Sequence, residues 1–335
     1  MKLTQIPLVS IIIVNYNGRP FLDDCLSSLN KIDYANIEII LVDNFSSDDS
    51  LNFVKKEYSN IICIELEKNF GFAKPNNLGA KIAKGKYLLF LNNDTIVESN
   101  FITELVKIAI EDQKIGILQS LLLKSNGEID SSGDFIDEIG IVYNSKSKVD
   151  KIRQISSARG ASMMIQKDIF EKCSGFDEKF FVSFEDVDLG WRVWILGYKV
   201  VVVPKSVVCH IGGKTIRSVN IDLAFHGLKN QLSMKITNFE SKFVFQNLVK
   251  FFIIYGLRES KIWLDHTIKG STTMTSTSYE DTMAKKPSIK TILKSLFWII
   301  GNMSYLWNKH KAVNNYRIKT TKELQSLNII SNKKQ

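Results

Sequence analysis

Residues 8–18, with the sequence LVSIIIVNYNG, decide the fold. Leu8–Val14 is a run of mostly β-branched residues, which is typical of a strand buried on both faces of a parallel sheet. A polar turn, Asn15-Tyr16-Asn17-Gly18, follows this run directly. An apolar N-terminal run can also be a secretory signal, but this one is short and no small-residue cleavage site follows it. We therefore expect a first β-strand with polar side chains at its carboxyl end.

Strand and helix patterns alternate over the next hundred residues. The strands expected are Ile37–Val42, Ile61–Ile64 and Tyr87–Leu91, and the helices expected are Phe21–Leu29, Ser50–Tyr58, Asn76–Lys84 and one that Ser99 caps and that ends near Glu111. Alternation at this spacing indicates βαβ units and a mostly parallel sheet with helices on both faces. The fold class predicted is α/β, with a Rossmann-like sheet and a C-terminal helical extension.

The pattern is weaker in the polar, Ser/Gly-rich residues 121–160, for which we expect hairpins or mobile loops over a site. Regular patterns return after Gly160. They predict strands at Ala161–Ile165, Val200–Val203 and Val207–His210, and helices at Lys167–Cys173, Glu185–Leu196 and Phe243–Leu257. A last apolar stripe runs from Ile289 to Leu306 at helical spacing, with aromatic residues and lysines around it.

These patterns divide the chain into four parts. Residues 1–220 would form the α/β domain, 221–269 a helical extension, 270–288 a linker rich in Ser and Thr, and 289–335 a basic amphipathic helical tail. No stretch of about 18 uninterrupted apolar residues occurs, so no segment is expected to span a bilayer.

Positive charge is concentrated in the tail. Residues 281–335 contain eleven Lys or Arg but only Asp281 and Glu323, whereas residues 1–280 contain 33 basic and 33 acidic residues. A neutral body argues against a nucleic-acid-binding surface. Lysines and aromatic residues on one short helix favour an anionic membrane surface as the partner of the tail, and the alternative is docking on the chain's own body or on a sister subunit.

The cysteines are far apart in the sequence, at Cys25, Cys63, Cys173 and Cys209, and none forms a CxxC pair. Reduced thiols in a cytoplasmic protein are therefore expected. With the basic tail, this predicts a protein that is peripherally attached to the cytoplasmic face of a membrane.

Polar clusters follow three of the predicted strands. They are Asn15-Tyr16-Asn17, Asp43-Asn44 and Asn92-Asn93-Asp94. Because ligands of such sheets bind at the carboxyl ends of the strands, these clusters indicate one binding site. Neither GxGxxG nor GxxxxGK[ST] is present, which argues against a dehydrogenase and a P-loop ATPase. A metal ion beside Asp94 is the expected device for holding an anionic ligand.

Three carboxylates, Glu185, Asp186 and Asp188, begin the helix that follows the aromatic run Phe180–Phe184. Asp188 is placed for an ion pair with Arg192 one turn later, which is a structural role. Glu185 and Asp186 lie next to the aromatic run, which can keep them partly dry. Either carboxylate is a candidate general base, with Asp186 preferred.

Taken together, the motifs resemble those of the family 2 glycosyltransferases of the GT-A fold, in particular the rhamnosyltransferase-like branch. The resemblance covers about residues 7–220. It rests on Val9–Gly18, Val42-Asp43-Asn44 with Ser46-Ser47-Asp48, Asn69–Ala73 with Asn76–Gly79, Leu91–Thr95, Gly175–Glu178, and Phe184–Leu189 with Trp191-Arg192, in this order.

The resemblance implies an inverting transfer of one sugar from a nucleoside diphosphate sugar to a lipid-linked or polysaccharide acceptor. It implies that Asn15, Tyr16, Asn17, Asp43, Asn69, Gly71, Asn77, Asn92 and Asn93 line the nucleotide-sugar site. Asp94 would bind Mg²⁺ or Mn²⁺ on the diphosphate, and His210 is the candidate second metal ligand. Asp186, or Glu185 beside it, would take the proton of the acceptor hydroxyl.

The sequence departs from the family pattern at two places. Asn92 stands where the metal-binding motif often begins with Asp, and Lys74-Pro75 replaces small residues before Asn76-Asn77. Because no QxxRW motif is present, a processive synthase is not expected. A sugar-nucleotide pyrophosphorylase would need a Gly-rich, Arg-bearing loop after the first strand, where this chain has Asn15–Gly18. A non-catalytic module that binds sugar nucleotides or membranes remains the alternative from another functional class.

Overall fold

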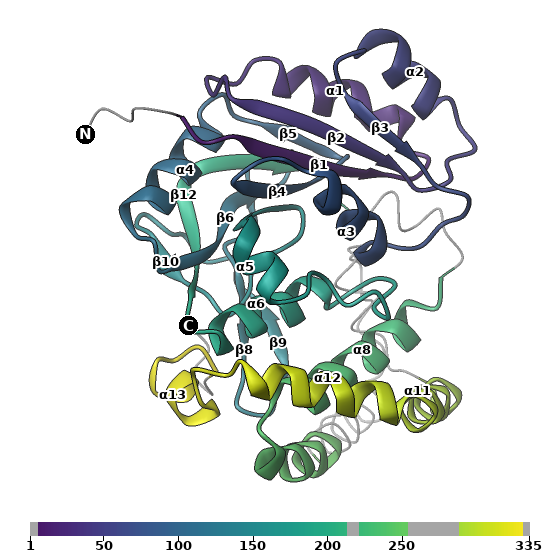
Figure 1. Ribbon diagram of the computed structural model, residues 1–335, viewed down its shortest axis with the longest axis vertical. Helices are drawn as coiled ribbons and strands as arrows, with labels where there is room; N and C mark the ends of the chain where they lie inside the picture. The colour runs from purple at the N-terminus through teal and green to yellow at the C-terminus, as the bar shows by residue number, and fades with distance from the viewer. Residues whose placement is uncertain (1–5, 213–220, 254–287, 331–335) are drawn as a thin grey trace, which may run out of the picture.

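The structure is a computed structural model, and it describes residues 6–212, 221–253 and 288–330. A central ten-stranded sheet has the order β10-β12-β6-β11-β4-β1-β2-β3, with β5 paired to β12 and β7 paired to β6. Helices cover both faces of this sheet, and a further group of C-terminal helices lies beyond the helices of one face (Figure 1). The α/β fold class predicted from the sequence is confirmed.

The first half of the sheet is parallel. Its strands are β1 (Val9–Asn15), β2 (Ile37–Asp43), β3 (Ile62–Glu65) and β4 (Tyr87–Asn92), and its helices are α1 (Arg19–Leu29), α2 (Ser50–Glu57) and α3 (Ala73–Ile82). β1 lies between β2 and β4, with Asn15 opposite Asp43 and Val14 opposite Asn92. This register brings the polar residues after all three strands to one edge of the sheet.

The second half of the sheet is mixed. Its strands are β5 (Thr95–Val97), β6 (Ile115–Leu123), β7 (Ile129–Ser131), β10 (Arg153–Gln154), β11 (Ser162–Gln166) and β12 (Lys199–His210), and its helices are α4 (Phe101–Glu111), α5 (Lys167–Lys172) and α6 (Glu185–Ile195). β11 runs antiparallel between β4 and β6. A separate small sheet pairs β8 (Asp134–Ile136) with β9 (Val142–Asn144), so hairpins do occupy the weakly patterned region.

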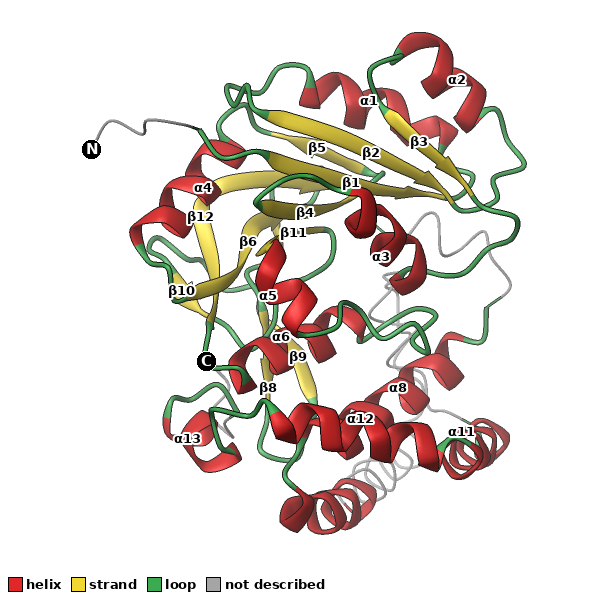
Figure 2. Ribbon diagram, in the orientation of Figure 1, coloured by secondary structure: helices red, strands yellow, loops and turns green. Residues whose placement is uncertain are grey.

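Two apolar cores form on opposite faces of the sheet. In β1, Val9, Ile11 and Ile13 pack with residues of α1 and α4, whereas Ile12 packs with residues of α3, α5 and α6. Successive side chains of a strand point to opposite faces, so a run of apolar residues in β1 serves both cores. Figure 2 shows the sheet as one layer between these two sets of helices.

Three details differ from the sequence prediction. The strands expected at Val200–Val203 and Val207–His210 are one strand, β12, whose register against β6 shifts between these two runs. Asn100, not Ser99, precedes α4, and neither side chain caps the helix. β5 and β6 were not expected, because β5 has three residues and β6 directly follows a helical pattern.

The C-terminal helices are α8 (Leu223–Asn238), a helix at 241–253, α11 (Ile289–Gly301), α12 (Met303–Asn315) and α13 (Thr321–Ser326). The prediction of a single helix from Ile289 to Leu306 is wrong. The helix is interrupted at Asn302, which caps the end of α11 and the start of α12. Gly301 and Asn302 both favour helix ends over helix interiors. α11 and α12 both pack on α8, and Leu324, Ile329 and Ile330 join the core of the α/β domain.

Two other sequence predictions for this region fall wholly or partly outside the described residues. The 270–288 linker lies outside the described part of the chain except for Ser288, and so do residues 254–257 of the predicted Phe243–Leu257 helix. Among the described residues, no helix has the length and apolar character needed to cross a bilayer.

Candidate functional site

A hydrogen-bonded network links the ends of β1, β2 and β4. The Nδ2 group of Asn15 donates to Oδ1 of Asp43 at 3.1 Å, and Nδ2 of Asn93 donates to Oδ1 of Asn15 at 2.8 Å. Ser46, in the turn after β2, donates its hydroxyl to Asp43 at 2.6 Å and accepts from the backbone N–H of Asn17 at 2.9 Å. The three polar clusters predicted at the strand ends therefore form one connected surface.

Asp43 is almost completely buried in this network. Its Oδ1 accepts from Asn15 and Ser46, and its Oδ2 accepts from the backbone N–H of Ser46. Each carboxylate oxygen can accept more than one hydrogen bond, so Oδ2 retains capacity for a ligand donor. Tyr16 and Asn17 are partly exposed beside it, and Asn17 has the left-handed φ of 50° that turns the chain away from β1.

The loop before α3 is held against this edge by two asparagines. Nδ2 of Asn44 donates to Oδ1 of Asn69 at 3.0 Å and to the carbonyl of Gly71 at 2.8 Å. Gly71 has φ 79°, and a Cβ there would lie 2.0 Å from the carbonyl oxygen of Phe181. Glycine is thus required, both for the left-handed conformation and for close approach of the two loops.

Asn77 has a different setting. Its Oδ1 accepts from the N–H of Phe176 at 2.9 Å, and its Nδ2 donates to the carbonyl of the same residue at 2.9 Å and to Glu178 at 3.2 Å. The side chain of Asn77 thereby fixes the turn that precedes the aromatic run. Its amide groups are already bonded within the protein.

Asp94 and His210 meet where β5 pairs with β12. Oδ1 of Asp94 lies 3.5 Å from Nε2 of His210, and Nδ2 of Asn92 lies 3.3 Å from the same ring nitrogen. The other ring nitrogen, Nδ1, is 2.9 Å from Oδ2 of Asp130, at the strand β7. Oδ1 of Asp94 is buried and has no hydrogen-bond partner among the described residues.

This arrangement fits a divalent cation. Burial lowers the pKa of His210, but the hydrogen bond with Asp130 and the neighbouring Asp94 carboxylate outweigh burial and raise the pKa to about 9. A positive charge is therefore favoured between the two carboxylates. Without a metal, Nε2 therefore carries a proton at neutral pH. A bound cation would displace that proton, while Nδ1 continues to donate to Asp130, as in histidines that bind metals.

The described side chains provide only part of the coordination shell that such a cation needs. In the described part of the chain, no group of three or more His, Cys, Asp or Glu side chains is arranged as a metal site. Asp94 and His210 would supply two ligands, so a metal here would need further oxygens from a bound ligand such as a diphosphate.

Glu185 and Asp186 begin α6 after a strained turn. Ser183 and Phe184 both have left-handed φ angles, 72° and 68°, which are unfavourable for residues with a Cβ. Asn230 of α8 stabilises this turn by donating its Nδ2 to the carbonyls of Val182 at 2.9 Å and Ser183 at 2.7 Å. The strained turn therefore lies directly before the two carboxylates at the start of α6.

The two carboxylates have different surroundings. Burial, and then the neighbouring Asp186, raise the pKa of Glu185 well above its usual value, and its Oε2 has no hydrogen-bond partner in the described part. Burial also raises the pKa of Asp186, although the N–H of Gly160 and the charge of Arg159 oppose this. Asp186 is partly exposed whereas Glu185 is buried, so Asp186 is the more accessible of the two candidate bases.

A short stretch of backbone connects the two predicted halves of the site. Oδ2 of Asp186 accepts from the N–H of Gly160 at 3.0 Å. The carbonyl of the next residue, Ala161, accepts from the N–H of Asn92 at 3.1 Å. Asp186 and Asn92, which lies two residues before Asp94, thus both hydrogen-bond to residues 160–161.

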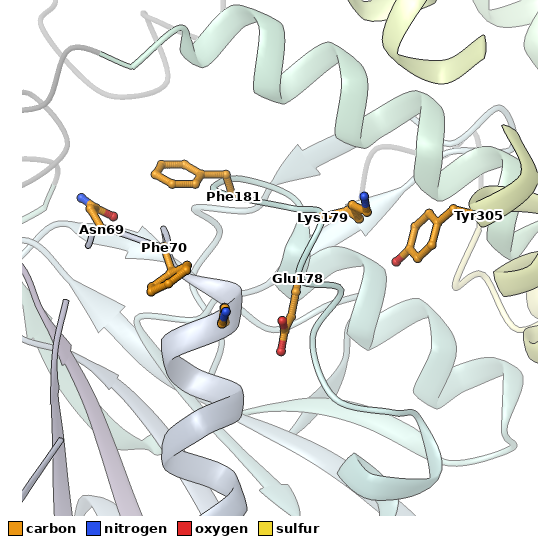
Figure 3. A pocket seen from close by; sticks show the side chains of 7 residues that line it. Asn69, Phe70, Glu178, Lys179, Phe181 and Tyr305 are labelled. Atoms are coloured by element: carbon orange, nitrogen blue, oxygen red, sulfur yellow. The ribbon is translucent and has the colours of Figure 1, made fainter. Parts of the chain in front are cut away.

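A pocket of 450 Å³ opens beside the loop that precedes α3. Figure 3 shows Phe70 and Phe181 on one side of it and Tyr305 of α12 on the other, with Glu178 and Lys179 between. Asn69 and Lys74 complete its wall. The C-terminal helices, which were predicted as a separate extension, therefore contribute to the surface next to the site.

Asp188 has the structural role predicted for it. Its Oδ2 pairs with Arg192 at 2.8 Å and with Lys309 of α12 at 3.0 Å, and Lys309 also pairs with Asp177 at 2.5 Å. The side chains of Asp177 and Asp188 are fully buried. This ion-pair network fastens α12 to the helix that carries the candidate base.

Sequence reasoning did not identify Asp130, Asn230, Tyr305 or Lys309 as residues of this region. Asp130 contacts a residue 80 positions away, and Lys309 contacts one 132 positions away. No local motif marks such contacts. For Asn230, the available signal was the polar pair Lys229-Asn230 within a helix that is buried. Buried polar side chains need hydrogen-bond partners, so such a pair indicates a contact with another segment.

Known proteins resemble this chain in both sequence and fold. The family described as Glycosyl transferase family 2 matches residues 10–174. The O-antigen biosynthesis protein RfbC of Myxococcus xanthus is 29% identical over 221 residues, which cover 61% of this chain and 17% of that protein. The poly(ribitol-phosphate) beta-glucosyltransferase of Bacillus spizizenii is 33% identical over 140 residues, covering 36% of this chain and 22% of that protein. The matched region is thus under a quarter of the length of either relative.

Two solved structures share the fold over almost the whole chain. The mannosyltransferase PcManGT from Pyrobaculum calidifontis, in complex with GDP-Man and Mn²⁺, has a TM-score of 0.57 and 16% identity, covering 96% of this chain and 88% of its own. S. aureus TarS 1–349 has a TM-score of 0.54 and 16% identity, covering 92% and 89%. At this identity the likeness shows the fold alone. The chain therefore has a GT-A-like α/β fold with added C-terminal helices, and its residues 10–174 are similar to glycosyl transferase family 2.

Proposed function

We propose that this chain transfers one sugar from a nucleoside diphosphate sugar to a hydroxyl group of a lipid-linked or polysaccharide acceptor, with inversion at the anomeric carbon. The observation that supports the proposal is that Asp186 and Asn92, two residues before Asp94, both hydrogen-bond to residues 160–161. One carboxylate is placed for a cation and the other for a base. The names of the relatives, which refer to O-antigen biosynthesis and poly(ribitol-phosphate), support a cell-envelope glycan as the acceptor.

The donor nucleotide would lie along the ends of β1, β2 and β4. Asn15, Asp43 and Asn93 form the hydrogen-bonded floor, and Tyr16 and Asn17 are partly exposed beside it. Oδ2 of Asp43 would accept a hydrogen bond from the base. Asn69 and Gly71 shape the facing loop, Asn77 fixes the neighbouring turn at Phe176, and the sugar transferred would be a hexose or a deoxyhexose.

A divalent cation, Mg²⁺ or Mn²⁺, would be held by Asp94 and His210, with Asn92 alongside. When bound, it would neutralise the charge that develops on the departing diphosphate. Asp130 would keep the His210 ring in the orientation that presents Nε2, and the orphaned Oδ1 of Asp94 would gain a partner. PcManGT is in complex with GDP-Man and Mn²⁺ in its solved structure, which supports this assignment.

Asp186 would act on the acceptor. Its carboxylate takes the proton of the acceptor hydroxyl as the oxygen forms a bond to the anomeric carbon, and the bond from that carbon to the diphosphate oxygen breaks. The nucleoside diphosphate leaves with the electron pair, and the proton later passes from Asp186 to solvent. Burial and the neighbouring Asp186 raise the pKa of Glu185 well above its usual value, so Glu185 stays protonated while Asp186 is ionised.

Nucleotide binding tests this proposal directly. We expect one nucleoside diphosphate to raise the melting temperature of the chain by about 5 °C at 100 times its Kd in the presence of Mn²⁺, and by much less after EDTA treatment. The measurement is a thermal-shift panel of uridine, thymidine and guanosine diphosphates. If none of the three changes the melting temperature with or without Mn²⁺, the proposed donor site is wrong.

Replacing Asp130 with Ala tests the metal site. We expect this change to weaken Mn²⁺ binding by about 10- to 100-fold, because the His210 ring loses the acceptor that orients it. Electron paramagnetic resonance of free Mn²⁺ gives the affinity without any turnover. Asp150→Ala is the matched control, since Asp150 lies in the same region but its side chain is 74% exposed. Equal Mn²⁺ affinities of the two variants would contradict the role given to Asp130.

A further inference from the structure

α11 carries a row of large apolar side chains that face away from the protein. Ile289, Leu293, Phe297 and Ile300 are exposed, with Ile289 at 78% and Phe297 at 71%. At 100° per residue these four positions lie within an arc of about 80° on the helix surface. Such a continuous exposed apolar row is unusual on the surface of a monomeric soluble protein.

The packing of α11 does not use this row. Ile299 is buried, and Ile292, Leu296 and Trp298 pack against the cluster that contains Leu228 and Leu232 of α8. Ser295 is buried too, and it donates its hydroxyl to the carbonyl of Thr291. α11 therefore packs on the protein through one side only, and its exposed row is available for contact with a partner.

The helix at 241–253 presents a second row of the same kind. Phe245 is 78% exposed and Ile253 is 55% exposed, and Val249 is exposed between them. The opposite side of this helix, through Val244, Leu248 and Phe251, packs into the same cluster as α11. Both helices lie at the end of the molecule farthest from the sheet, where α11 and the helix at 241–253 form its lower boundary (Figure 1).

The helices that carry these rows have only basic charged side chains, and beside them Asp222 pairs with Lys294 at 3.1 Å and Glu240 with Lys242 at 3.4 Å. Residues 289–315 and 241–253 contain no Asp or Glu. Lys290 and Lys294 border the α11 row, Lys242 and Lys250 lie on the second helix, and Lys311 is exposed on α12. A bound surface must therefore accept apolar side chains and also supply negative charge.

We propose that the exposed rows of α11 and of the helix at 241–253 form a docking surface for an anionic lipid bilayer. A second copy of this chain is disfavoured, because a symmetric contact would bring the lysines of two copies together, and Asp222 and Glu240 already pair with Lys294 and Lys242 of their own chain. No described helix is long and apolar enough to cross a membrane, so the helices lie in the plane of the interface. This surface is independent of glycosyl transfer, and its test needs no sugar nucleotide.

Vesicle sedimentation tests the docking surface with the full chain. We expect it to sediment with vesicles that contain phosphatidylglycerol but not with pure phosphatidylcholine vesicles, and added salt should weaken the binding. Leu293→Gln/Phe297→Gln should lower the partition coefficient about 100-fold, because two large side chains no longer enter the bilayer. Lys290→Gln/Lys250→Gln should lower it on the order of tenfold without changing any apolar contact.

The matched control is Ile62→Gln/Ile152→Gln, which changes two exposed apolar side chains away from these helices and should bind as the unaltered chain does. Melting temperatures show whether each variant is folded. Equal binding to neutral and anionic vesicles, or unchanged binding of both paired variants, would overturn the proposal. So would light scattering that shows a dimer which Leu293→Gln/Phe297→Gln converts to a monomer, since a second copy would then be the occupant.

Discussion

Replacing Asp186 with Asn is expected to lower kcat about 1,000-fold, with little change in the affinity for nucleoside diphosphate. The amide keeps the shape of the carboxylate and can still accept from the N–H of Gly160, but it cannot take a proton from the acceptor. The strand-end network that would bind the nucleotide includes no atom of Asp186. Steady-state kinetics and nucleotide titration measure the two quantities separately.

Two further variants sharpen this prediction. Asp168→Asn removes an exposed carboxylate that pairs with Lys172 on α5, and it should leave kcat unchanged. Glu185→Gln should reduce kcat less than Asp186→Asn, because the buried Glu185 cannot reach the acceptor. If Glu185→Gln abolishes turnover and Asp186→Asn does not, the base is Glu185. If Asp186→Asn binds nucleotide and retains full turnover, the proposed mechanism fails, and loss of both properties would indicate a folding defect.

The pH dependence of kcat should reflect the same pair. Burial raises the pKa of Asp186 and of Glu185, and their mutual repulsion raises that of Glu185 further. The ionised base is therefore lost at a higher pH than for an exposed aspartate, so kcat should fall as the pH decreases through this raised pKa. In Glu185→Gln, a neutral amide replaces a carboxyl whose raised pKa keeps it protonated while Asp186 titrates, so we expect the acidic limb of the profile to keep its position.

Replacing Lys309 with Met is expected to lower the free energy of unfolding by about 3 kcal/mol. Asp177 and Asp188 are fully buried, and Lys309 is the only residue whose ion pairs join them in the described part of the chain. Without the ammonium group, Asp177 keeps only neutral donors, the hydroxyl of Tyr305 and the N–H of Lys179. A buried carboxylate that loses its cation is strongly destabilised, whereas Met preserves most of the packing of the aliphatic chain.

Urea unfolding of Lys309→Met measures this loss, and Lys311→Met is its control. Lys311 lies on the same helix two residues later and is exposed, so its replacement should change the free energy of unfolding by less than about 0.5 kcal/mol. Equal stabilities of the two variants would show that the network of Asp177, Asp188 and Lys309 does not fasten α12. Because Tyr305 lies one turn before Lys309, Lys309→Met should also disturb the pocket that Tyr305 lines.

The strands and the polar residues at their ends could be predicted because their signals are local. A run such as β1 is apolar on both sides wherever it lies in a covered parallel sheet, and its register with β2 and β4 then places Asn15, Asp43 and Asn92 at one edge. Element limits were less accurate where two elements follow each other closely. β6 follows α4 after a few residues, and the shifted register within β12 made one strand look like two.

The composition of the tail could be read from the sequence, but the direction in which each side chain points could not. The stripe from Ile289 to Leu306 contains both exposed and buried residues: Phe297 faces outward, whereas Leu306 is fully buried. The break at Asn302 turns α12 toward α8, and Lys309 becomes part of a buried network instead of a basic surface. An apolar residue has the same sequence signal in both settings, since only its neighbours decide what it covers.

The sequence by itself determined the α/β class, the edge of the sheet at which the polar clusters gather, and the residue types on which the proposed site depends. The tertiary structure decided that Asp130 supports His210, that Asn230 holds the strained turn before Glu185, and that α12 fastens α6. Hydrophobic periodicity is a property of neighbouring residues and is visible in any short segment. A partner for a buried charge or a strained turn is selected by packing between segments far apart in the chain, so it appears only when they are brought together.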